Sequence, residues 1–161
     1  MDDQYIYIGL GSNLDEPINQ IRVAIDEIKS VKNFTFVASS SLYKTPPMGP
    51  QDQPDYINAV VKIKSNMPAL ALLDKMQALE QVHGRVRLEK WGARSLDLDI
   101  LLFGQQQIDT ERLKIPHPGL YDRAFVLYPL LEVEPDLLLP NGVLLVEQVA
   151  ALGKQDIVKL T

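Results

Sequence analysis

The chain has 161 residues, with 16 Lys and Arg against 21 Asp and Glu, and its formal net charge of −5 argues against a general nucleic-acid-binding protein. Because it contains no cysteine, the composition excludes disulfides, thiolate catalysis, zinc fingers and iron–sulfur ligation, and it fits a reducing, cytoplasmic location. Purely apolar runs never exceed five residues, so no membrane span is expected. The length favours a single domain over residues 1–161.

The first half of the chain predicts three strands and one helix. Residues 4–10 are rich in β-branched and aromatic types, which favour a strand. Pro17 suits the first turn of a helix, in which isoleucines recur at helical spacing: Ile18, Ile21, Ile25 and Ile28. A second strand is predicted over residues 34–44, followed by a stiff loop over residues 45–54, where four prolines exclude helix and central strand. Alternation over residues 56–63 predicts a third strand with two distinct faces.

The second half predicts two helices and two strands. Pro68 opens a helix that Gly84 ends, and one face of this helix carries Leu72, Leu73, Met76 and Leu79. Residues 96–103 restore strand character, residues 105–109 contain a turn and a short fifth strand, and residues 125–131 form a helix. The last thirty residues are assigned to no element. The order predicts an α+β fold, a ferredoxin-like sandwich in which helices cover an antiparallel sheet.

The segment Leu96-Asp97-Leu98-Asp99-Ile100 carries the most chemical information. Strand alternation places its two carboxylates on one face, roughly 6.5 to 7 Å apart, and its apolar residues on the other. At an effective dielectric of about 20, two such charges repel by roughly 2 to 2.5 kcal/mol. A magnesium ion shared with substrate phosphates would turn this repulsion into attraction. The alternative is a solvent-facing strand whose polar side is acidic.

A cationic segment precedes this strand, although the chain as a whole is acidic. Its ten residues include Arg85, Arg87, Lys90 and Arg94. A guanidinium group pairs bidentately with phosphate oxygens, so a cationic loop beside an acidic strand suits a magnesium-bound triphosphate. The alternative is a solvated charged loop. Trp91, the only tryptophan, is either a buried anchor or a mobile lid residue.

Tyr56 and Asn58 share one strand face directly after the proline-rich loop. A tyrosine ring can stack on a flat heterocycle while a carboxamide binds its edge, so the pair could recognise a pterin-like or purine-like ring. The alternative is an aromatic side chain resting on the sheet beside a satisfied amide. His117 lies between two prolines and is either a positioned or a structural side chain, whereas His83, at a helix end, is interpreted as structural.

The sequence Gly9-Leu10-Gly11 invites a dinucleotide-binding interpretation. That interpretation fails because Leu14 stands where the motif has its third glycine. The chain also has no lysine-bearing phosphate loop. We interpret the glycines as a tight passage of the backbone, with Ser12 and Asn13 hydrogen-bonded locally.

Several motifs, kept in one order, together resemble a single enzyme family. They are Gly11-Ser12-Asn13, Tyr43-Lys44-Thr45-Pro46-Pro47, Gly49-Pro50-Gln51-Asp52-Gln53-Pro54-Asp55-Tyr56-Ile57-Asn58, Gly84-Arg85-Val86-Arg87, Trp91-Gly92, Arg94-Ser95-Leu96-Asp97-Leu98-Asp99-Ile100 and Pro116-His117. The chain resembles the 6-hydroxymethyl-7,8-dihydropterin pyrophosphokinases of folate biosynthesis, over about Tyr5 to Leu131. The resemblance implies a ferredoxin-like fold and transfer of a pyrophosphoryl group from ATP to the hydroxymethyl oxygen of the pterin, releasing AMP. From composition and charge we expect a cytoplasmic protein without nucleic-acid or membrane partners, and we predict a monomer.

The resemblance assigns roles to particular residues. Asp97 and Asp99 would hold two magnesium ions, and with Arg85 and Arg94 they are expected to carry the catalysis. The pterin would be bound by Thr45, Pro46, Pro47, Met48, Tyr56, Asn58 and Phe125. ATP binding or loop closure is implied for Gln77, Glu80, Arg85, Arg87, Trp91, Arg94, Ile100, Arg112, His117 and Arg123.

The chain departs from the family pattern at a few positions. The stretch 85–91 is one residue shorter than in the best-known members, and Lys90 replaces an arginine and lacks its bidentate fork. Pro118 replaces a tyrosine and Lys114 a threonine near the nucleotide. No role is assigned to these three residues or to the residues after Leu131.

Two other functions remain alternatives. In a non-catalytic ferredoxin-like ligand-binding or regulatory module, the two aspartates would be mere surface charge. A metal-dependent nuclease is disfavoured by the acidic balance and by the set of Tyr56, Asn58 and Phe125. Phosphoryl-type transfer needs an alcohol placed in line and cations spread over the developing charge. Asp99 is a weak candidate for the base, because a carboxylate that binds metal is a poor base.

Overall fold

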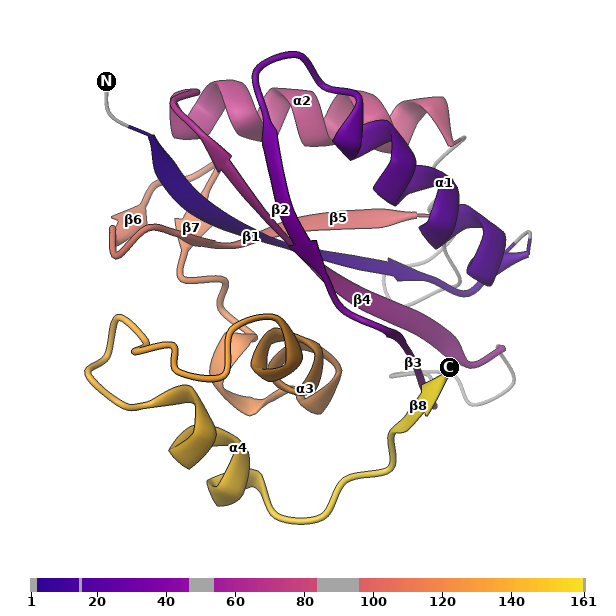
Figure 1. Ribbon diagram of the computed structural model, residues 1–161, viewed down its shortest axis with the longest axis vertical. Coiled ribbons are helices and arrows are strands. Elements are labelled where there is room, and N and C mark those ends of the chain that lie inside the picture. Colours follow the sequence, from indigo (N-terminus) through magenta and orange to yellow (C-terminus); the bar gives the residue numbers. More distant parts are fainter. Residues whose placement is uncertain (1–2, 15, 47–53, 84–95, 161) are drawn as a thin grey trace.

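The computed structural model describes residues 3–14, 16–46, 54–83 and 96–160 (Figure 1). Its main sheet consists of β1 (Gln4–Ser12), β2 (Thr35–Ser39), β3 (Leu42–Thr45), β4 (Tyr56–Ser65), β5 (Asp97–Phe103) and β8 (Val158–Leu160). All pairs in it are antiparallel, in the order β5-β1-β4-β3-β8, with β2 also paired to β4. A separate two-stranded sheet is formed by β6 (Ile108–Asp109) and β7 (Lys114–Ile115).

Helices cover both faces of the main sheet. One face carries α1 (Pro17–Lys29) and α2 (Ala69–Val82), and the other carries α3 (Ala124–Val133), as Figure 1 shows. A short helix, η1 (Leu120–Asp122), precedes α3, and α4 (Leu145–Leu152) packs on α3 from outside. This arrangement confirms the predicted α+β ferredoxin-like sandwich. Among the described residues, no helix is both long enough and apolar enough to cross a bilayer.

The two faces of the sheet bury two separate cores, because successive side chains of a strand point in opposite directions. In β1, Ile6 and Ile8 lie in the core under α1 and α2, whereas Tyr7 lies in the core under α3. The predicted apolar face of α1 is confirmed for Ile21 and its neighbours but wrong for Ile18, which is 40% exposed. At 100° per residue, Ile18 lies about 70° from the centre of the buried stripe.

One predicted strand is two strands in the structure. The segment 34–44 forms β2 and β3, which are separated at Ser40 and Ser41. The hydroxyl of Ser40 accepts a hydrogen bond from the Val60 N–H at 2.9 Å, where a strand carbonyl would otherwise bond. A side-chain acceptor of this kind competes with the ladder and interrupts it.

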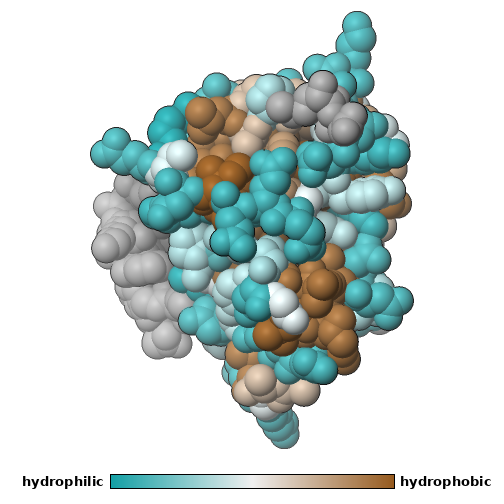
Figure 2. Space-filling model, turned by 90° about the vertical axis from the view of Figure 1, so that its left-hand side faces the viewer, coloured by the Kyte–Doolittle hydropathy of each residue, from teal (hydrophilic) through white to brown (hydrophobic). Residues whose placement is uncertain are grey.

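The C-terminal thirty residues, which the sequence left unassigned, contribute α4 and β8. The strand β8 pairs with β3 at the edge of the sheet. Leu138, Leu144 and Val146 of this region keep 41 to 51% of their surface exposed. Figure 2 shows apolar surface gathered over the layer that contains α3 and α4. The C-terminal residues therefore add a second apolar layer, part of which contacts solvent.

Candidate active site

The site residues meet on the part of the sheet face that continues beyond the α3 core. Alternation along β1 places Tyr7, Gly9 and Gly11 on this face. Tyr7 is 4% exposed in the core, whereas Gly9 pairs with Asp99 and Gly11 pairs with Asp97 in the register of β1 and β5. On its other side, Gly11 pairs with Asn58 of β4. Since paired residues project to the same face, Gly11 lies between Asp97 and Asn58, and Gly9 lies between Asp99 and Val60.

The glycines leave this strip of β1 without side chains. A Cβ atom on Gly11 would lie 3.3 Å from Asn58 Oδ1, and one on Gly9 would lie 3.3 Å from Leu101 Cδ2. Both contacts are tighter than ordinary packing, so the neighbours occupy the space that larger residues would need. The sequence interpretation of a tight backbone passage is correct, but it missed that this passage lies beside Asp97, Asp99 and Asn58. Glycines two apart on a strand were the available signal.

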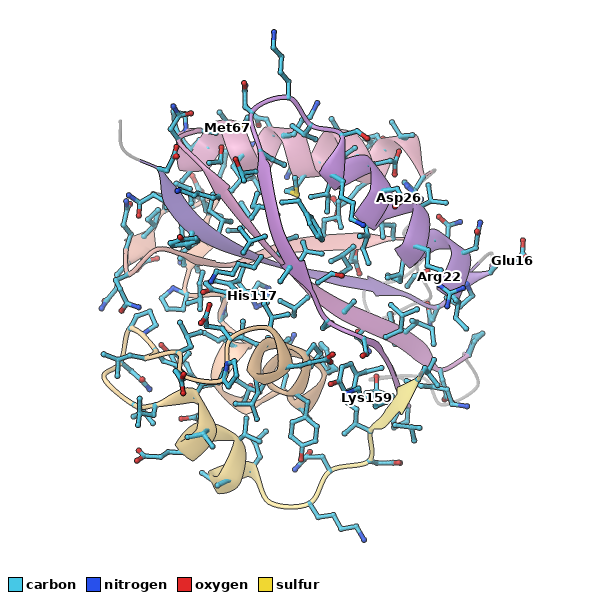
Figure 3. All side chains as sticks on the ribbon, viewed as in Figure 1. Glu16, Arg22, Asp26, Met67, His117 and Lys159 are labelled. Carbon is cyan, nitrogen blue, oxygen red and sulfur yellow. The ribbon has the colours of Figure 1, made fainter. Side chains whose placement is uncertain are left out.

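The two carboxylates differ in their exposure. Asp97 is partly buried at the start of β5, and the Asp99 side chain is 52% exposed. His117, labelled in Figure 3, lies between the sheet and the α3 layer, with its Nε2 3.9 Å from Asp99 Oδ2. The Gly119 N–H donates to His117 Nδ1 at 3.1 Å. In a neutral imidazole the acceptor nitrogen carries no proton, so the proton of His117 is on Nε2, the nitrogen nearer Asp99.

These two carboxylates fit a magnesium ion. In the part of the chain that the structure describes, no cluster of three or more His, Asp or Glu side chains forms a complete metal cage. Mg²⁺ does not require one, because it binds one or two carboxylates and takes its other oxygens from phosphates and water. Two carboxylates on one strand face, with Asp99 half exposed, match this donor set. Solvent screening around Asp99 also weakens their mutual repulsion.

Glu80 of α2 supports the strand that carries the carboxylates. Its side chain is buried, and its Oε2 accepts a hydrogen bond from the Leu98 N–H at 2.8 Å. Among the described residues, only β1 pairs with β5, so Leu98 would otherwise present an unpaired N–H on the outer edge of the sheet. Glu80, which the resemblance places at ATP, therefore fixes the backbone between Asp97 and Asp99.

We expect Glu80→Ala to lower the free energy of unfolding by about 1 to 3 kcal/mol, because the buried Leu98 N–H loses its acceptor. Urea denaturation followed by circular dichroism measures the change. Gln81→Ala, at the next and exposed position of α2, is the matched control and should stay within about 0.5 kcal/mol. Equal stability of the two variants would contradict the bracing role of Glu80.

The proposed pterin side of the site is built on β3 and β4. Asn58 is 4% exposed, and its Nδ2 donates to Thr45 Oγ1 at 3.0 Å. Tyr56, partly buried, pairs with Thr45 in the register of these strands. Asn13 Nδ2 donates to the Pro54 carbonyl at 3.0 Å. We predicted that Asn13 bonds locally, and this bond contradicts that prediction because it joins residues far apart in sequence. It links the end of β1 to the start of β4.

The remaining predicted residues come from α2, from α3 and from the segments next to α3, β3 and β7. Phe125 of α3 is partly buried, and the Arg123 guanidinium lies 5.8 Å from the centre of its ring. Arg112 donates to Asp74 at 2.6 Å and to Gln77 at 3.4 Å, both on α2. Pro46, which the resemblance assigns to pterin binding, is exposed directly after β3.

Two predicted residues have buried, structural surroundings. Ile100 is 4% exposed and packs in the core under α1 and α2, so its side chain is closed to a nucleotide. His83 is confirmed as structural, because its ring is held between Gln20 and Glu27 of α1. Several predictions lie outside the described residues: Pro47, Met48, Gly84, Arg85, Arg87, Lys90, Trp91 and Arg94.

Comparison with solved structures defines the class of fold. A crystal structure titled HPPK-DHPS in complex with substrates superposes with a TM-score of 0.75 over 94% of this chain and 43% of that chain, at 11% identity. The Plasmodium falciparum HPPK-DHPS gives a TM-score of 0.72 over 93% of this chain and 41% of that chain, at 13% identity. This chain thus spans less than half of those longer proteins, and the likeness shows a shared α+β fold.

Comparison of sequences is more specific. The family described as 7,8-dihydro-6-hydroxymethylpterin-pyrophosphokinase (HPPK) matches residues 7–135. The 2-amino-4-hydroxy-6-hydroxymethyldihydropteridine pyrophosphokinase of Haemophilus influenzae is 49% identical over 154 residues, which is 96% of each protein. The enzyme of the same name from Pseudomonas aeruginosa is 49% identical over 157 residues, covering 98% of this chain and 97% of that enzyme. The chain belongs to the 7,8-dihydro-6-hydroxymethylpterin-pyrophosphokinase family.

Proposed function

We propose that the chain transfers a pyrophosphoryl group from ATP to the hydroxymethyl oxygen of 6-hydroxymethyl-7,8-dihydropterin, giving the pterin diphosphate and AMP. The observation that carries this proposal is the glycine strip of β1, which has Asp97 and Asp99 on one side and Asn58 on the other. A polyphosphate with its cation suits the acidic side, and a flat polar heterocycle suits the carboxamide side. Membership of the family supports the same reaction.

Asp97 and Asp99 are the residues that would hold magnesium. When bound there, Mg²⁺ neutralises phosphate charge and polarises the phosphoryl group that is attacked. We propose that Asp97 and Asp99 would together hold two ions, which would supply positive charge to the triphosphate as in other phosphoryl-transfer sites. The absence of cysteine also supports a cytoplasmic setting for the reaction.

The reaction forms one bond and breaks one bond. The hydroxymethyl oxygen bonds to the β-phosphorus of ATP, and the bond from that phosphorus to the oxygen of AMP breaks. AMP leaves with this oxygen, and the hydroxyl proton passes to solvent. The chain itself orients the groups: Asn58 holds the pterin edge, and the Nε2–H of His117 donates to a phosphate oxygen beside Asp99. Little covalent participation by the protein is needed.

AMP release tests this function directly. With ATP and magnesium, we expect AMP to form only when the pterin alcohol is added, in a one-to-one ratio with the pterin diphosphate, as measured by liquid chromatography. Chelation of magnesium should stop the release. Release of ADP, release of AMP without the pterin alcohol, or no turnover would each overturn the proposal. The last result, with the pterin still bound, would favour a ligand-binding module.

A further inference from the structure

A carboxylate near the end of α3 accepts hydrogen bonds from residues at the start of β3. Glu132 Oε1 accepts hydrogen bonds from the Ser41 N–H at 3.0 Å and from Tyr43 Oη at 2.7 Å. Its Oε2 accepts from Ser41 Oγ at 2.8 Å and approaches the same N–H at 3.1 Å. Both oxygens of the carboxylate are therefore used to hold the break between β2 and β3. Lys159 of β8 adds a cation 3.9 Å from Oε2.

The charges of this cluster favour the same bonds. Burial raises the pKa of Glu132, but hydrogen bonds from Tyr43 and Ser41 outweigh burial and hold the pKa below its usual value. Burial, together with the hydrogen bond to Glu132, raises the pKa of Tyr43. The carboxylate is thus charged and the phenol protonated at neutral pH, which is the combination that makes a strong charge-assisted hydrogen bond.

The strand held in this way forms the wall of the proposed pterin side. Tyr43 pairs with Asn58, and Thr45 pairs with Tyr56, in the register of β3 and β4. Thr45 also accepts the hydrogen bond of the Asn58 amide. β3 has four residues and its outer neighbour β8 has three. Because the ladder between them is so short, the position of β3 also depends on contacts from the layer that contains α3.

We propose that Glu132 is a positioning residue for the pterin substrate, acting through Tyr43 and Ser41 to set β3 and, through Thr45, the Asn58 amide. The proposal rests on the proposed function of the site. It gives the residues after Leu131, to which the sequence assigned no role, a part in substrate binding: Glu132 holds β3 from α3, and Lys159 joins the same carboxylate from β8. None of these residues is a catalytic residue.

The same helix offers a matched control. Glu134, the residue directly after α3, accepts hydrogen bonds from Tyr7 Oη at 3.2 Å and from Lys62. Lys62 lowers the pKa of Glu134 through its hydrogen bond, so this carboxylate is also charged. This second brace joins α3 to β1 and β4 without touching β3. Like Glu132, Glu134 is a charged carboxylate that accepts a hydrogen bond from a tyrosine hydroxyl. The two differ in the strands that they contact.

The test compares Glu132→Gln and Tyr43→Phe with Glu134→Gln and Tyr7→Phe. Calorimetry in magnesium buffer with a non-hydrolysable ATP analogue measures the affinity for the pterin alcohol, and a second titration measures the affinity for the analogue alone. We expect Glu132→Gln to weaken pterin binding about five- to tenfold and to raise the KM for the pterin alcohol with little change in kcat. Tyr43→Phe should give a smaller change in the same direction.

The control pair should leave the affinity for the pterin alcohol within about twofold of wild type, even where it lowers thermal stability. Unchanged pterin binding in both Glu132→Gln and Tyr43→Phe would overturn the positioning role, as would an equal loss in Glu134→Gln. Equal weakening for the pterin alcohol and the ATP analogue would also overturn it, because that pattern indicates general loosening. Failure of the wild-type protein to bind the pterin alcohol would instead overturn the proposed function itself.

Discussion

Replacement of either strand aspartate, by Asp97→Asn or Asp99→Asn, is expected to lower turnover by about a thousandfold or more. A loss of this size corresponds to about 4 kcal/mol of transition-state stabilisation, which is the scale of a metal ion that neutralises phosphate charge. The amide keeps the shape of the side chain, so the fold should stay intact. AMP production under saturating ATP and pterin alcohol measures the effect.

Asp136→Asn, at an exposed position after α3, is the matched control and should keep wild-type turnover. Stability gives a second readout. Without magnesium, removal of one of two like charges on a strand face should leave the free energy of unfolding unchanged or slightly raised. Near-normal turnover in Asp97→Asn and Asp99→Asn, with that stability pattern, would mean that the aspartates are surface charge and that the chain is a binding module.

The sequence predicted the parts of the fold that depend on local periodicity. Alternation along residues 56–63 identified β4, and helical spacing identified the buried stripe of α1. It failed where a contact distant in sequence decides the structure. The separation of β2 from β3 depends on the Ser40 hydroxyl bonding to Val60, and β8 has a place only because β3 offers it an edge. Neither contact has a periodic signal.

The same limit applies to the site. Asp97, Asp99 and Asn58 could be selected because carboxylates and a carboxamide in strands need a reason. Their arrangement around the glycines could not, because it depends on the register of β1 with β4 and β5. Register also explains the support that the sequence missed. The resemblance assigned Glu80 to ATP, whereas the sheet places the Leu98 N–H beside it, and Glu132 reads as an ordinary acidic helix residue until the sheet places the Ser41 N–H beside it.

Asn58→Asp is expected to weaken binding of the pterin alcohol by about a hundredfold, or about 2.7 kcal/mol. The amide offers one donor and one acceptor group, whereas the carboxylate offers only acceptors, so a ring that needs both is left with an unpaired polar group. The local structure should survive, because the Thr45 hydroxyl, which now accepts from the amide, can rotate and donate to the carboxylate instead. Calorimetry with the ATP analogue present measures the loss.

Thr45→Val separates recognition by the amide from its orientation. This variant keeps the shape of the side chain but removes the hydroxyl that accepts a hydrogen bond from Asn58. The Asn58 amide is still present but is no longer held in one orientation, so we expect the affinity for the pterin alcohol to fall about tenfold. The affinity for the ATP analogue should be unchanged in both variants, because the acidic side of the strip is untouched. If Asn58→Asp bound the pterin alcohol as tightly as wild type, the heterocycle would have to be held by other residues, and the assignment of this side of β1 to the pterin would be wrong.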